Sequence, residues 1–130
     1  MVHNVSLESG LAQHIDRRVH VLKMHKPYHE SDHVLNLAYN TLAGGQHVED
    51  LELLRSDSHY MNALGATRIP DPTTAGDFLR RFSAKQILRL QEAVNAARVG
   101  VWQRAGSTLL QERGIVEIDA KICSSTAECK

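Results

Sequence analysis

Apolar residues recur at helical spacing through most of the first 105 positions, and this pattern predicts a mainly α-helical chain. The first predicted helix covers residues 7–25 and ends before Pro27, because proline interrupts the helical hydrogen-bond ladder. Its apolar positions step by three or four residues and should form the buried face: Leu7, Leu11, Ile15, Val19 and Leu22.

Three further short helices are predicted between residues 31 and 65, each with its own start or stop signal. Ser31 is a candidate cap for the second helix, and Gly44-Gly45 ends it. The third covers residues 48–55, and the fourth begins at Asp57 or Ser58 and closes at Gly65. The expected inward positions of these three helices are Val34, Leu35, Ala38, Leu42, Val48, Leu51, Leu54, Tyr60, Met61 and Leu64.

The last predicted helix is long and begins at Ser83, which serves as its cap. Its apolar positions follow a heptad: Ile87, Leu90, Val94, Ala97 and Val101. The repeat is too short to require a coiled coil, so packing within a helical bundle is the favoured interpretation.

Residues 68–82 carry the most specific local pattern, Arg-Ile-Pro-Asp-Pro-Thr-Thr-Ala-Gly-Asp-Phe-Leu-Arg-Arg-Phe. The two prolines exclude a helix over residues 69–72, and Thr73 or Thr74 can cap the helix that follows. The expected buried stripe is Ala75, Phe78, Leu79 and Phe82. A helix with one buried apolar face, hydroxyls at its N-terminus and arginines further along is typical of a helix-turn-helix recognition helix. An ordinary amphipathic helix has the same pattern.

The character of the chain changes at Gly114, where residues 115–122 become rich in β-branched side chains and predict a strand. One strand alone has no partner for its backbone polar groups, so the chain is expected to stop where a sheet begins. Two regions follow: a helical region over residues 1–113 and the start of a second domain over residues 114–130. Asp119 lies in this strand, where it either points outward as an exposed acid or holds a cation.

The formal net charge is zero, but the charges are unevenly distributed. Residues 27–66 hold six acids and one arginine, whereas residues 68–113 hold eight bases and four acids. Phosphate binding depends on the local patch of charge, so the second segment is compatible with DNA binding.

The sequence has no 18-residue apolar run and no secretory signal, so a cytoplasmic protein with no membrane span is expected. Cys123 and Cys129 are expected to be reduced thiols. His29 and His33 lie one helical turn apart, but no third ligand is evident and metal binding there is not favoured.

Several spaced segments resemble, in order, the N-terminal part of bacterial insertion-sequence transposases of the DDE group one type. They are Ser-Asp-His-Val-Leu-Asn-Leu-Ala-Tyr-Asn at 31–40, Gly-Gly at 44–45, Val-Glu-Asp-Leu-Glu-Leu-Leu-Arg at 48–55, Leu-Gly at 64–65, Ile-Pro-Asp-Pro-Thr-Thr-Ala-Gly-Asp-Phe at 69–78, Arg-Arg-Phe at 80–82, Ile-Asp at 118–119 and Glu-Cys-Lys at 128–130. The resemblance implies a helical DNA-binding region followed by an RNase-H-like domain whose Asp-Asp-Glu triad holds two Mg²⁺ ions. Residues 120–127 depart from the glycine-containing stretch that follows the aspartate in such proteins.

By this resemblance Asp119 is the first triad carboxylate and a metal ligand, while the second aspartate and the glutamate are absent from the 130 residues. The chain is therefore expected to bind the element's terminal repeats. It is expected neither to cleave DNA nor to bind Mg²⁺ itself. The expected DNA contacts are Arg68, Thr73, Thr74, Asp77, Arg80, Arg81 and Lys85. The alternative is a helical interaction module without a DNA role, whose long last helix mediates self-association; in either case a homodimer is a candidate assembly.

Overall fold

The computed structural model describes residues 2–24 and 27–106. This part of the chain is mainly helical, as the apolar spacing predicted. Its elements in chain order are α1 (Val2–Glu8), α2 (Leu11–Arg18), α3 (Glu30–Leu42), the 3-10 helix η1 (Val48–Asp50), α4 (Leu51–Ser56), α5 (Ser58–Leu64), α6 (Pro72–Leu79) and α7 (Ala84–Ala105). The predicted strand at 115–122, Asp119 and the domain boundary at residue 114 lie outside the described residues.

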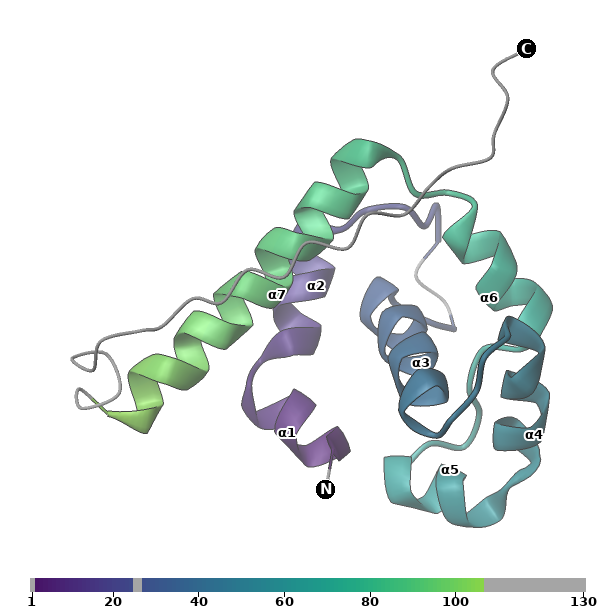
Figure 1. The fold of residues 1–130 in the computed structure, drawn as a ribbon. Coiled ribbons are helices and arrows are strands. Elements are labelled where there is room, and N and C mark those ends of the chain that lie inside the picture. Colours follow the sequence, from purple (N-terminus) through teal and green to yellow (C-terminus); the bar gives the residue numbers. More distant parts are fainter. Residues whose placement is uncertain (1, 25–26, 107–130) are drawn as a thin grey trace, which may run out of the picture.

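Helix α7 lies along α2 and is the longest element, while α3 stands between this pair and the group formed by α4, α5 and α6 (Figure 1). The α2–α7 contact is built on Ile15 and Val19, both fully buried, and on the small side chain of Ala93. The backbone N–H of His20 donates to Oε1 of Gln86, and Nε2 of Gln86 donates to the carbonyl of His20. The segment that follows α2 is therefore held to the first turns of α7 by both apolar packing and a paired amide.

The single helix expected over residues 7–25 is wrong. The chain bends at Gly10, whose φ of 71° is the left-handed conformation that glycine adopts without a Cβ clash. Helix α2 then ends at Arg18, and Val19 is already extended, so Pro27 does not end this helix. Because of the bend, Leu7 is exposed rather than buried.

The expected inward face of α3 is wrong in part: Val34 packs against the core cluster of Ile15, Val19 and Ala93, but the buried residues of α3 are largely polar. Leu42 is 67% exposed, whereas the buried positions are Glu30, Ser31, His33, Asn36, Tyr39 and Asn40. Oε1 of Glu30 accepts hydrogen bonds from the backbone N–H groups of Val21 and Leu22. Glu30, Ser31, Asn36 and Asn40 make hydrogen bonds to other segments of the chain, and helical spacing alone does not reveal such partners.

Ser31 does not cap α3. Its backbone N–H and its hydroxyl instead donate to the two carboxylate oxygens of Asp16, each at 2.9 Å. Asp32 supplies the local capping contact by accepting from the backbone N–H of His29 at 2.8 Å. Asp16 therefore joins α2 to the first turn of α3.

The remaining helix boundaries follow local sequence signals. Asp57 caps α5 by accepting from His59 N and Tyr60 N, and Gly65 ends α5 with a φ of 61°. Ser83 caps α7, as predicted, by accepting from the backbone N–H of Gln86. The expected third helix forms as η1 followed by α4, with Leu51 fully buried.

The heptad positions of α7 are only partly covered. Ala97 is buried, but Ile87, Val94 and Val101 are 49%, 44% and 41% exposed. Helix α2 has only eight residues and covers one narrow face of α7, which leaves the neighbouring apolar positions open. Among the helices of the described part, none combines the length and the apolar character that crossing a membrane requires.

Candidate nucleic-acid interface

Helix α6 begins at an aspartate cap rather than at a threonine cap. Oδ1 of Asp71 accepts from the backbone N–H of Thr74 at 2.9 Å, and Oδ2 accepts from the Thr74 hydroxyl at 2.8 Å. These hydrogen bonds hold the pKa of the Asp71 carboxyl below its ordinary value. Pro72 occupies the first helical position, where its missing N–H costs no hydrogen bond. The expected cap at Thr73 or Thr74 is therefore wrong by two to three residues.

The apolar back of α6 is narrower than the predicted stripe. Ala75 and Phe78 are buried, and Phe82 packs edge-on against Phe78 with ring centroids 5.1 Å apart. Leu79 was expected to be buried, but it is the last residue of α6 and is 46% exposed. Two side chains thus anchor this short helix, and the rest of its circumference is open.

Helix α3 holds α6 through two buried side chains, His33 and Asn36, whose contacts helical spacing did not predict. The imidazole of His33 stacks on Phe78, with ring centroids 4.4 Å apart and planes 11° from parallel. Nδ2 of Asn36 donates to the carbonyl oxygen of Pro70 at 3.3 Å. His33 and Asn36 are three residues apart on one face of α3, so together they hold the loop just before α6 and the last turn of α6.

Burial lowers the pKa of His33 from its ordinary value of 6.5. Asp32, Glu30 and Asp71 act in the opposite direction and Arg81 acts with the burial, but desolvation dominates. Nδ1 of His33 has no hydrogen-bond partner. His33 is therefore a buried aromatic contact, and in the part of the chain that the structure describes no group of three metal-ligating side chains includes it.

The residues expected to contact DNA are mostly exposed. Thr73, Asp77, Arg80, Arg81 and Lys85 are exposed around α6 and the turn into α7, and Thr74 is half-buried because its hydroxyl serves the cap. Nη2 of Arg80 donates to Oδ1 of Asp77 on the helix surface. These six residues lie on α6, in the turn that follows it and in the first turn of α7.

Arg68 lies apart from them, on the loop that leads into α6. Its guanidinium carbon lies 5.6 Å from the centroid of the Tyr28 ring, over the ring face. The side chain is exposed, so its charge remains accessible. Seven residues, 65–71, separate α5 from α6. That connection is longer than the turn of three or four residues in a helix-turn-helix, so the helix-turn-helix element remains a prediction.

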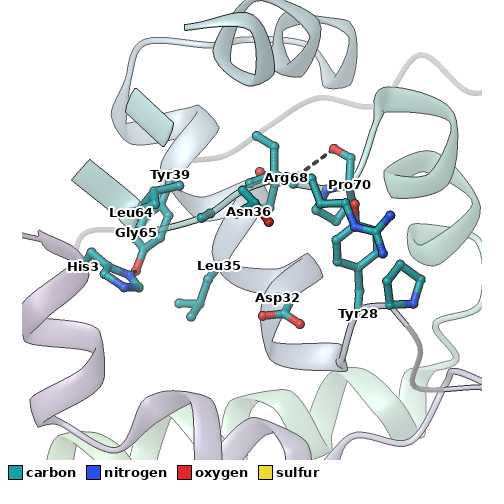
Figure 2. A pocket seen from close by; sticks show the side chains of 14 residues that line it. His3, Tyr28, Asp32, Leu35, Asn36, Tyr39, Leu64, Gly65, Arg68 and Pro70 are labelled. Carbon is teal, nitrogen blue, oxygen red and sulfur yellow. Dashed lines mark hydrogen bonds between the residues drawn. The ribbon is translucent and has the colours of Figure 1, made fainter. Parts of the chain in front are cut away.

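A cavity of about 380 Å³ opens between α3 and the loop before α6 (Figure 2). Tyr28 and Arg68 line one end, His3 and Leu64 line the other, and Asn36 lies between them. No sequence signal marked this cavity, because its walls come from α1, α3, the end of α5 and two loops that meet only in the folded chain.

No family model, curated protein or solved structure matches the chain.

Proposed function

We propose that this chain is the N-terminal portion of a DDE transposase and binds duplex DNA of the element's ends through α6 and the turn into α7. The observation that carries the proposal is the arrangement of charge around an anchored helix. Phe78 holds α6 on α3, while Arg80 and Arg81 stand exposed just past the end of α6 and Lys85 stands exposed in the first turn of α7. The order of the sequence segments that resemble such transposases supports the same reading.

Each exposed group has a distinct role in the proposal. Arg81 and Lys85 contact backbone phosphates, which supplies affinity without base specificity. Thr73 and Asp77 face outward from α6 and contact base edges, because hydroxyls and carboxylates can pair with groups in the major groove.

Arg80 is already paired with Asp77, but this pair does not prevent DNA binding. The side chains of Arg80 and Asp77 are 72% and 55% exposed. Ion pairs of this kind are worth at most about 1 kcal/mol, since water and salt screen them. Breaking the Arg80–Asp77 pair so that Arg80 can bind a phosphate therefore requires little free energy.

A second candidate function rests on the apolar side chains left open on α7. Ile87, Val94 and Val101 repeat every seven residues on one side of the helix and are all more than 40% exposed. Exposed heptad positions favour helix–helix association, so self-association without DNA binding is the alternative.

Fluorescence anisotropy of a labelled duplex titrated with the full chain at several salt concentrations tests the proposal. Binding whose affinity falls steeply with salt is expected, with a slope of about 0.9 per phosphate contact. No binding at low salt, together with a dimer in light scattering that Val94→Lys disrupts, would replace the proposal by the alternative.

A further inference from the structure

A smaller cavity, of about 230 Å³, lies where the segment after α2 passes beside the end of α6 (Figure 1). Two cationic side chains line it: Lys23 from the segment after α2 and Arg81 from the turn after α6. The residues that line it include no carboxylate. Within residues 2–24 and 27–106, neither cation forms an ion pair. The cavity therefore carries two positive charges and no negative one.

The carboxylates in the neighbourhood of this cavity are engaged elsewhere. Glu30, Asp32 and Asp71 act on His33, which forms part of the cavity wall. Each of these three carboxylates accepts a hydrogen bond from at least one backbone N–H group, which stabilises its negative charge where it is. Burial is the main cause of the lowered pKa of His33, and the Arg81 guanidinium adds to it, so the charge of Arg81 reaches the cavity wall.

The size and the charge of the cavity suit a phosphate group. Two like charges that line one cavity repel each other, and an anion close to both offsets that repulsion. Ammonium and guanidinium groups both donate charge-assisted hydrogen bonds to phosphate oxygens. A volume of about 230 Å³ is below the roughly 300–1,000 Å³ of sites for whole small molecules, so a small anion fits and a nucleotide does not.

We propose that this cavity binds one phosphate group, which Lys23 and Arg81 hold together. The phosphate belongs either to the backbone of bound duplex DNA or to free inorganic phosphate; the first source rests on the proposed function. The rest of the wall favours the first source, because Leu22, Met24 and Pro27 are apolar and suit the deoxyribose beside a backbone phosphate. The DNA interface then extends from α6 to the segment after α2.

Isothermal titration of the full chain with inorganic phosphate, in chloride buffer of constant ionic strength, tests the free source. The expected result is saturable binding that Lys23→Ala and Arg81→Ala each weaken about tenfold, as loss of a charge-assisted contact does. Lys23→Arg should retain binding because it keeps the charge. Arg17→Ala is the matched control, since Arg17 is an exposed cation of α2 that does not line the cavity. Circular dichroism should show the same helical content in every variant.

Fluorescence anisotropy of a labelled duplex with the same variants tests the backbone source. Lys23→Ala should weaken duplex binding about tenfold, whereas Lys23→Arg and Arg17→Ala should change it little. If Lys23 and Arg81 hold the same phosphate, their effects are coupled. The Lys23→Ala/Arg81→Ala variant should then lose clearly less than the roughly hundredfold that two independent contacts would cost.

Binding of inorganic phosphate that depends on Lys23 and Arg81 supports the proposal with a free ion as the source. Duplex binding that depends on Lys23 and is coupled to Arg81 supports it with the DNA backbone as the source. Failure of both arms would overturn it. Because inorganic phosphate needs no DNA, Lys23-dependent phosphate binding by a chain that does not bind duplex would remove the proposed function alone. Duplex binding that depends on Arg80, with no effect of Lys23→Ala in either arm, would remove this inference alone.

Discussion

The His33 imidazole lies flat against the Phe78 ring, and this stack joins the first turn of α3 to the last turn of α6. His33 is 3% exposed, and its Nδ1 has no partner. A protonated imidazole in this position would carry an unsolvated charge beside Arg81, whose guanidinium also disfavours it. The anchoring of α6 therefore depends on a neutral histidine.

Acid should consequently destabilise the fold through His33. Its pKa is lowered in the folded chain, so below pH 6.5 the unfolded chain binds the proton more readily. The contribution of neutral His33 to the free energy of unfolding is complete above pH 6.5 and is lost as pH falls toward the pKa of His33 in the folded chain. For one proton, the free energy of unfolding falls by at most about 1.4 kcal/mol per pH unit. Urea unfolding between pH 7.5 and 5 measures this slope.

His33→Phe keeps an aromatic ring against Phe78 and should flatten the pH dependence. The matched control is His59→Phe at an exposed position, which should leave the slope as in wild type. Equal slopes for wild type and His33→Phe would contradict the assignment.

Removal of the Asp71 cap should loosen the start of α6. Asp71→Ala deletes the acceptor for Thr74 N and for the Thr74 hydroxyl, and loss of a helix cap costs about 1 kcal/mol. Asp71→Asn is the control, because asparagine caps helices about as well. The carboxylate's low pKa means that its contribution is present above pH 3.8 and is lost as pH falls through the folded value. A free energy of unfolding unchanged by Asp71→Ala at pH 7 would show that this cap is dispensable.

Asp16 should contribute more to stability than its half-buried position on the eight-residue helix α2 indicates. Its two oxygens hold the backbone N–H and the hydroxyl of buried Ser31. Asp16→Ala leaves both donors without their partner and should cost about 1–3 kcal/mol. Asp77→Ala, which removes only an exposed ion pair, should change stability by less than about 1 kcal/mol. Thermal or urea unfolding of the two variants side by side makes the comparison, and similar losses would count against the Asp16 bridge.

The helices that the sequence predicted well are those whose ends are encoded locally. Asp57, Gly65 and Ser83 each act within three residues of their own position, so their caps could be assigned from the chain alone. The burial of Phe78 followed from helical spacing as well. The site residues Arg80 and Arg81 were selected by pattern, and their exposure agrees with that selection.

The errors share a different cause. The inward face of α3 was assigned to its aliphatic residues, but Asn36 and Glu30 are buried because distant segments, the Pro70 carbonyl and the N–H groups of Val21 and Leu22, supply their partners. Burial of a polar side chain depends on tertiary hydrogen bonds, which hydrophobic periodicity does not encode. The cavity beside Arg68 escaped prediction for the same reason.

DNA binding through α6 and the turn that follows it is tested by the salt dependence of duplex binding by the Arg80→Ala/Arg81→Ala double variant. Wild type and a control double variant, Arg89→Ala/Arg98→Ala, which removes two exposed arginines of α7, should give the same affinity and the same slope. The Arg80→Ala/Arg81→Ala variant should bind more weakly and lose about one unit of slope for each phosphate contact removed. Unchanged affinity and slope in a folded Arg80→Ala/Arg81→Ala variant would contradict DNA binding through α6 and the turn that follows it.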